Sequence, residues 1–167
     1  MDDIRICSVC GKAHAASNIE LIFRRPDIIA ALSIDERASR VRESEDLAIL
    51  DETRYFIRCL LPLAVAGRDD PYCFGIWAEV PQSTFERIRS LWRDADQASE
   101  PAFDCRLANE IPSLPPTVGV VAKLSLSGPT TRPDIHIVEC DHPLFDEQSR
   151  GITEHRVSEY GSYIPDA

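Results

Sequence analysis

The stretch TRYFIRCLLPLAV, residues 53–65, alternates apolar and other residues more regularly than any other part of the chain. Its apolar series consists of Tyr55, Ile57, Cys59, Leu61, Leu63 and Val65. Period-two alternation is typical of a β-strand with one buried face. A turn-rich segment, Gly67–Pro71, follows, and a second apolar series runs from Tyr72 to Val80. These stretches predict a long antiparallel hairpin.

A second hairpin is expected in the C-terminal half. Its first strand has the alternating residues Val118, Val120, Ala122, Leu124 and Leu126. Ser127-Gly128-Pro129 begins a turn, and Arg132–Cys140 forms the return strand. Between the hairpins lies the proline-rich segment 100–116, which has too little apolar periodicity for a helix and is expected to be an ordered loop.

Helices are expected outside the hairpins. Ser33 with Glu36, and Ser83 with Glu86, have the spacing of a capping box that opens a helix. Further helical segments are predicted at 26–32, 143–150 and 153–163. The sequence therefore predicts an α+β fold, in which an antiparallel sheet of about four main strands has helices packed on one face. A single domain is expected over residues 1–167.

Composition narrows the range of partners and compartments. The 167 residues include 18 Lys and Arg against 28 Asp and Glu, so the formal net charge is −10. This field repels a phosphate backbone, which argues against nucleic acid and suits a basic protein partner. No apolar stretch approaches the ~20 residues needed to cross a bilayer, and Met1-Asp2-Asp3 does not resemble a secretory signal. We therefore expect no membrane association and a cytoplasmic location.

The six cysteines are better interpreted as thiols or metal ligands than as disulfides in that compartment. Cys59, Cys73, Cys105 and Cys140 stand singly among apolar or strand-like neighbours, which predicts buried structural thiols.

The N-terminal segment 4–14 contains a candidate metal site. Cys7 and Cys10 form a CxxC followed by Gly11, a knuckle in which both sulfurs face one point. Zinc in structural sites takes four ligands. The candidates for the missing ones are His14, by proximity, then Cys140 and His142, and after these Cys105 or His136. A redox-active thiol pair and an inert turn are the other interpretations of the CxxC.

His142 belongs to a second short motif, Cys140-Asp141-His142. Adjacent residues on a strand point to opposite faces, which disfavours a nucleophile pair. Asp141 ahead of Pro143 is expected to be the N-cap of the following helix. His142 stays a candidate metal ligand or site residue at the edge of the sheet.

Four segments together resemble the bacterial domain-of-unknown-function family 2199. They are CSVCGKAH (7–14), FGIW (74–77), FER with LW (85–92), and DHPL followed by EQ and GIT (141–153). The resemblance implies a bacterial origin, one intact domain and no established activity. It also implies that Cys7, Cys10, His14 and the segment 141–148 recur in the family, although Phe145-Asp146 departs from the usual small residue before the Glu-Gln pair.

Three classes of function remain open. The leading one is a protein-interaction module, with or without zinc at the N-terminal knuckle, because phosphate loops, nucleophile elbows and His-Glu-x-x-His pairs are all absent from the sequence. The second is a metal-dependent enzyme that uses Cys7, Cys10, His14 and His142. The third is a thiol redox protein that uses Cys7 and Cys10.

Overall fold

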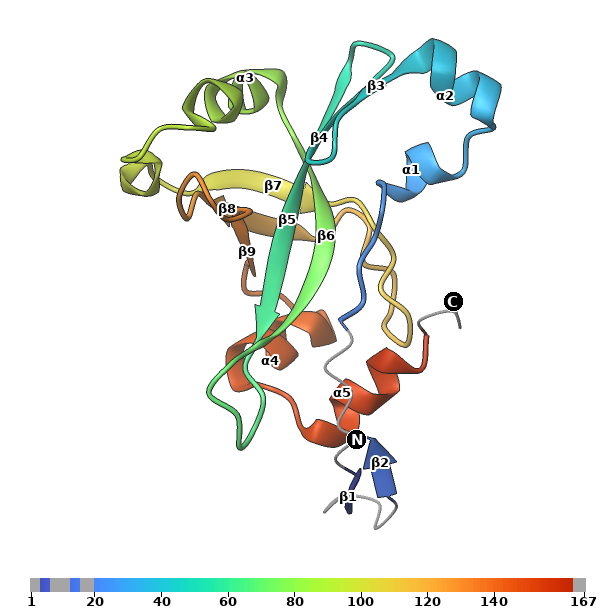
Figure 1. The fold of residues 1–167 in the computed structure, drawn as a ribbon, viewed down its shortest axis with the longest axis vertical. Coiled ribbons are helices and arrows are strands. Elements are labelled where there is room, and N and C mark those ends of the chain that lie inside the picture. The colour runs from blue at the N-terminus through green and yellow to red at the C-terminus, as the bar shows by residue number, and fades with distance from the viewer. Residues whose placement is uncertain (1–3, 7–12, 16–19, 164–167) are drawn as a thin grey trace.

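The computed structural model describes residues 4–6, 13–15 and 20–163. In that part of the chain, one sheet has the strand order β3-β4-β5-β6-β7-β8-β9 (Figure 1). The bounds are β3 Val41–Glu43, β4 Leu47–Leu50, β5 Arg54–Leu63, β6 Tyr72–Val80, β7 Phe103–Leu107, β8 Val121–Ser125 and β9 Asp134–Ile137. A separate hairpin consists of β1 Ile4–Ile6 and β2 Ala13–Ala15.

Strands β5 to β9 close into a barrel. Each neighbouring pair from β5 to β9 is antiparallel, and β9 returns to pair with β5 in parallel at Leu60 and Asp134. The backbone N–H of Leu60 also donates to the carbonyl of Pro133 at 2.8 Å. The parallel closure follows from the number of strands, because a meander of five strands reverses four times and its first and last strands run the same way.

The predicted sheet of about four strands with helices on one face is wrong. The expected hairpins are present as β5–β6 and β8–β9, but β7 lies inside the segment 100–116 that was expected to be a loop. β7 pairs with β6 on one side and β8 on the other, so it joins the two hairpins and lets the sheet close. Its alternation covers five residues, with Cys105 and Leu107 buried, and this signal is too short to stand out between Pro101 and Pro112.

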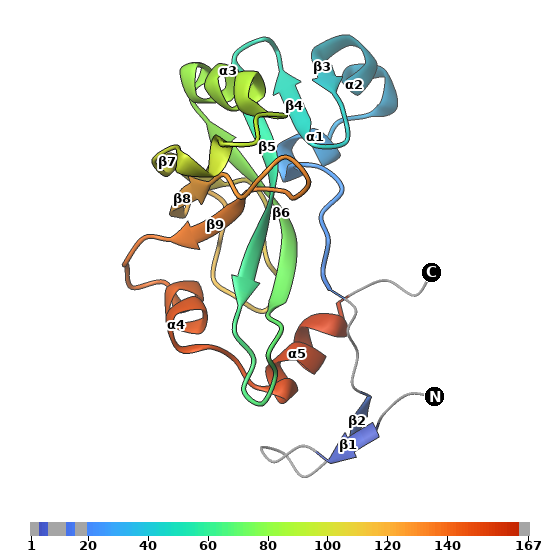
Figure 2. The same cartoon turned by 60° about the vertical axis from the view of Figure 1, so that its left-hand side comes forward.

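The helices lie around both ends of the barrel (Figures 1 and 2). They are α1 Asp27–Ala30, α2 Ile34–Arg40, α3 Gln82–Leu91, the 3-10 helix η1 Gln97–Ser99, α4 Pro143–Arg150 and α5 Glu154–Gly161. At one end, Phe85 of α3 packs on Tyr55 with ring centroids 5.2 Å apart. At the other end, Tyr160 of α5 meets the ring of Phe74 edge-on at 4.8 Å. Helices therefore cover the two open ends, where a barrel exposes its interior.

The core has two parts. The odd positions of β5 point into the barrel and are buried, as the period-two pattern predicts. On the outer face, a smaller cluster is formed by Ile29, Ala48, Leu50, Phe56, Trp77 and Ala108. The indole N–H of Trp77 donates to the carbonyl of Phe23 at 3.0 Å. The upper part of β5 and β6 is therefore covered on both faces, which explains why some even positions are apolar.

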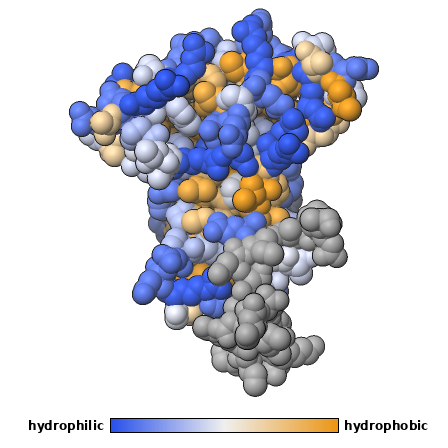
Figure 3. All heavy atoms as spheres, viewed as in Figure 1, coloured by the Kyte–Doolittle hydropathy of each residue, from blue (hydrophilic) through white to orange (hydrophobic). Residues whose placement is uncertain are grey.

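The segment before α1 covers the edge of β6. Phe23 N donates to Gly75 O at 2.8 Å, and Gly75 N donates to Leu21 O at 3.1 Å. The expected strand at 19–23 is thus reduced, in its described part, to a single parallel bridge between Ile22 and Gly75. A Cβ at Gly75 would lie 3.0 Å from Ile22 Cγ2, so a larger residue at this position would require the side chain of Ile22 to shift. Figure 3 shows apolar residues exposed at the middle of this face, beside β6, and Ile22 itself is 59% exposed.

The helix starts agree in part with the sequence. The capping box of Ser33 and Glu36 at α2 is confirmed, with both reciprocal hydrogen bonds present. The second predicted box is wrong, because α3 begins at Gln82 and Pro81 precedes it without a side-chain cap. Pro81 is the N-cap residue, with an extended backbone (φ −60°, ψ 155°), so the helix begins one residue before Ser83.

Candidate functional site

The predicted metal ligands of the N-terminal knuckle lie at the margin of the described residues. Cys7 and Cys10 fall outside them, and of His14 the structure describes the backbone, which pairs with Arg5 across the hairpin. The antiparallel register Ile4–Ala15 to Ile6–Ala13 places the CxxCG segment in the connection between β1 and β2. The metal, metalloenzyme and redox interpretations of these residues therefore stay predictions.

His142 has both ring nitrogens engaged by the protein. It is the N-cap of α4, and its Nδ1 accepts a hydrogen bond from Leu144 N at 3.1 Å. Its Nε2 lies 3.1 Å from the carbonyl oxygens of Pro115 and Pro116, which assigns the proton to Nε2, because carbonyls only accept. The imidazole thus joins the start of α4 to the proline-rich segment. The predicted cap is shifted by one residue, from Asp141 to His142.

The described side chains do not form a metal cluster. Among residues 20–163, no group of three or more His, Cys, Asp or Glu side chains is arranged to hold a metal ion. In both views, α4 lies on one side of the lower end of the molecule, and the β1–β2 hairpin lies on the other (Figures 1 and 2). The helix that packs beside β2 is α5.

The single cysteines are mostly structural, as predicted. Cys59 and Cys105 are buried, and burial raises the pKa of Cys59 well above its usual value and that of Cys105 to about 12. Cys73 is half-buried, and burial raises its pKa to about 11. These three groups are protonated thiols at neutral pH, which makes them poor nucleophiles. The prediction is wrong for Cys140, which is exposed.

Gln148 holds the seam of the barrel together. Its Oε1 accepts from the backbone N–H of Ile137 at 2.7 Å, and its Nε2 donates to Ile135 O at 2.9 Å and Pro62 O at 3.2 Å. Pro62 is on β5, and the two isoleucines are on β9. The side-chain amide therefore replaces the ladder hydrogen bonds where these strands diverge beyond their single pair. Sequence reasoning missed this role, since Gln148 stands in a helix and its partners are distant in the chain.

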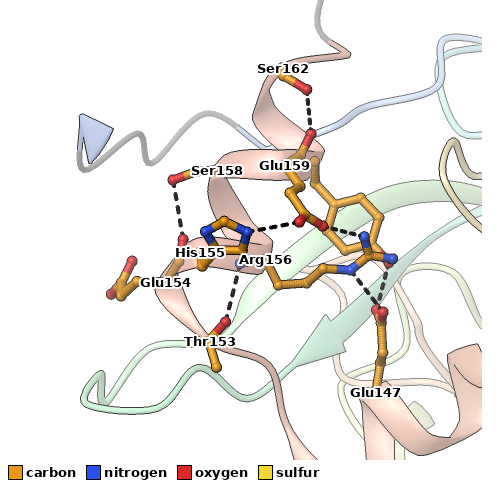
Figure 4. Close-up of polar contacts among 9 residues, drawn as sticks. Glu147, Thr153, Glu154, His155, Arg156, Ser158, Glu159 and Ser162 are labelled. Carbon is orange, nitrogen blue, oxygen red and sulfur yellow. Dashed lines mark hydrogen bonds and ion pairs between the residues drawn. The ribbon is translucent and has the colours of Figure 1, made fainter. Parts of the chain in front are cut away.

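Glu147, beside it, anchors α5 through a network of ionic hydrogen bonds (Figure 4). Its carboxylate accepts from Arg156 Nε at 2.8 Å and from Tyr160 Oη at 2.5 Å. Arg156 also donates to Glu159 at 2.6 Å, and Glu159 lies 2.9 Å from the ring of His155. Arg156 lowers the pKa of Glu159, and burial together with Glu147 raises the pKa of Tyr160. The arrangement orders two helices and leaves no unpaired base beside a nucleophile.

The surface that runs from β8 and β9 into α4 is acidic and carries exposed valines. Val121 of β8 and Val138, the residue that follows β9, are 42% and 37% exposed, and Val138 N donates to Val121 O at 3.1 Å. Three exposed acids follow, Glu139, Asp141 and Asp146, and none of them has an ion pair within residues 20–163. Figure 3 shows hydrophilic residues over α4. We refer to Val121, Val138, Glu139, Asp141 and Asp146 as the acidic strip.

A comparison with protein families assigns the chain to one of them. A family model described as uncharacterised protein conserved in bacteria (DUF2199) matches residues 6–152. This match agrees with the resemblance of the four sequence segments. No curated protein and no solved structure matches the chain. Within the described residues, none of the helices has both the length and the apolar character that crossing a membrane requires.

Proposed function

We propose that this chain, which belongs to the bacterial family DUF2199, is a protein-interaction module that binds a basic protein partner in the cytoplasm. The observation that carries the proposal is the acidic strip, in which exposed valines stand next to carboxylates without partners in the described chain. Binding surfaces combine an apolar centre with polar groups that select the partner. Carboxylates that are not paired within the protein are available to a lysine or arginine of a partner.

The rest of the charge distribution supports this location. Residues 134–159 include seven aspartates and glutamates but only two basic residues, Arg150 and Arg156. Arg156 is already paired with Glu147 and Glu159, so it does not neutralise the strip. Elsewhere, many acids are paired with arginines, as in Arg25–Glu43, Arg54–Glu79 and Arg132–Asp46. The strip is therefore a concentrated part of the −10 net charge.

Charge reversal tests the proposal. The double variant Glu139→Lys/Asp141→Lys changes the strip, and Asp69→Lys/Asp70→Lys changes two exposed acids of the β5–β6 turn by the same charge. Each protein, immobilised, is exposed to a lysate of the source bacterium, and bound proteins are identified by mass spectrometry. We expect one basic protein to bind the wild type and the turn variant, and not the strip variant. Equal loss from both variants, or the absence of a basic partner, would refute the strip as the binding surface.

The N-terminal knuckle is proposed to bind zinc as a structural accessory, with Cys7 and Cys10 as ligands and His14 and His142 as candidates for the others. The proposal is supported by the β1–β2 hairpin, whose connection contains the CxxCG segment. Native mass spectrometry of protein purified without chelator measures the bound metal. We expect one zinc per chain in the wild type and in Cys73→Ser, and none in Cys7→Ser/Cys10→Ser. For His142, zinc binding requires that its Nδ1 or Nε2 exchange a hydrogen bond for the metal, so His142→Ala tests it separately.

A further inference from the structure

Arg58 is an incompletely partnered guanidinium on the outer face of β5. Its Nε is buried and has no hydrogen-bond partner among the residues that the structure describes. Its Nη1 meets the backbone carbonyl of Glu45 at 3.4 Å, which is a long contact. Its Nη2 makes no hydrogen bond within that part of the chain and is not buried, so solvent reaches it. Buried donors without acceptors are rare in folded proteins and point to an absent partner.

Two guanidinium groups and two carboxylates lie near Arg58, so the cluster as a whole has three positive and two negative charges. Arg132 uses the two neighbouring carboxylates, with Nε 2.7 Å from Asp46 and Nη2 3.3 Å from Glu45. Burial lowers the pKa of Arg58, and the nearby guanidinium groups of Arg132 and Arg24 lower it further, while Asp46 and Glu45 act against them. Arg24 has no ion pair in residues 20–163. Within residues 20–163, the side chain of Arg132 alone pairs with these carboxylates, and that of Glu45 is 77% exposed.

A hollow of about 410 Å³ adjoins this cluster. Leu60, two residues after Arg58 on the same outer face of β5, lines it together with Asp46 and Arg132. The remaining wall consists of Trp92, Gln97 and the loop 128–131. Thr130 and Thr131 of this loop are exposed and bring hydroxyl donors to the same rim as Arg132.

We propose that Arg58, with Arg24 and Arg132, binds a phosphate group, either free phosphate or the phosphate of a small organic molecule whose remainder lies in the hollow. Guanidinium groups match phosphate oxygens in charge and geometry, and a phosphate group offers more acceptor oxygens to several guanidinium groups than a single carboxylate does. Threonine hydroxyls add neutral donors, and the half-buried indole of Trp92 offers an apolar wall for an organic group. The site lies outside the acidic strip, and it does not depend on the proposed protein partner.

Calorimetric titration of the full chain at constant ionic strength tests the site, with inorganic phosphate and phenyl phosphate as probes. We expect saturable binding to the wild type and binding about tenfold weaker in Arg58→Gln, the loss that accompanies removal of a charged hydrogen bond. The control is Arg42→Gln, an exposed arginine paired with Glu52 at the surface, and it should bind like the wild type. Arg58→Gln is expected to fold, because the side chain is half-buried on the outer face of β5 and its buried Nε lacks a hydrogen-bond partner within the described residues. Arg24→Gln, at an exposed position, should also weaken binding. This variant tests the proposal if Arg58→Gln does not fold.

The two probes distinguish the sources of the phosphate. Tighter binding of phenyl phosphate, with a change in tryptophan fluorescence, assigns the site to a small organic phosphate. Equal affinities assign it to free phosphate. The proposal is overturned if neither probe binds saturably, or if the wild-type affinity survives in both Arg58→Gln and Arg24→Gln.

Discussion

The side-chain amide of Gln148 donates to the carbonyl of Pro62 at 3.2 Å, across the line where the first and last strands of the barrel meet. Strands β5 and β9 share one pair, Leu60 with Asp134, so most of their facing backbone groups lack a strand partner at this seam. Proline has no N–H, but its carbonyl still needs a donor when it is not solvated. Gln148 supplies that donor and also bonds both backbone groups of β9 that face it.

Replacing Gln148 with leucine should therefore destabilise the protein by about 2–3 kcal/mol, since each unsatisfied buried backbone group costs about 1–3 kcal/mol. The free energy of unfolding from urea titration measures the effect. Gln82→Leu is the matched control, because the amide of this exposed glutamine contacts Glu86 on the surface of α3, and a change within about 0.5 kcal/mol is expected. Similar losses in both variants would show that Gln148 does not hold the seam.

His142→Ala should lower the free energy of unfolding by about 1–2 kcal/mol, because α4 loses its N-cap and the proline-rich segment loses its donor. His142→Asn should recover part of this loss, since the asparagine oxygen can still accept from Leu144 N. The exposed His136 of β9 provides a control, and its alanine variant should change stability little. An asparagine variant no more stable than the alanine variant would argue against the capping role.

Tyr160→Phe separates the hydroxyl from the ring. The ring should keep its packing on Phe74 and Tyr72, while Glu147 and Arg156 lose a partner at 2.5 Å and 2.9 Å. We expect a loss of about 1–2 kcal/mol in the free energy of unfolding, as for a hydrogen bond to a charged group. Tyr163→Phe, at a residue 48% exposed, should have almost no effect. An unchanged Tyr160→Phe would show that the network of Figure 4 adds no stability.

Alkaline pH should destabilise the protein through its buried thiols. Burial raises the pKa of Cys105 to about 12, so the folded state retains a proton that the unfolded state releases above pH 9. The free energy of unfolding then falls as the pH rises from about 9 towards 12, by up to about 1.4 kcal/mol per pH unit for each such thiol. Urea titrations at pH 8 and pH 10 should show a shallower fall in Cys105→Ala than in the wild type. The exposed Cys140→Ala should follow the wild type, and identical slopes in all three proteins would contradict this assignment.

The parts of the site that the sequence could indicate were those with local signals. The CxxC spacing marks a candidate knuckle, and the acidic composition points to a basic partner, because both depend only on residue type and order. The roles of His142 and Gln148 could not be predicted in the same way. Their partners, Pro115, Pro116 and Pro62, are brought to them only by the fold. The shortage of acceptors at Arg58 likewise depends on Arg132 having taken Asp46.

The amino-acid sequence by itself determined the long hairpin of residues 54–80. The alternation of its side chains is a local property, and it favours a strand in any β-fold in which one face of the sheet is buried. It also determined the capped start of α2, where Ser33 and Glu36 satisfy each other within one turn. Tertiary structure alone decided that the hairpins close into a barrel. Closure requires the five-residue strand β7 between them and one parallel pair between β5 and β9, and such contacts gain stability only when segments distant in the sequence are already in place.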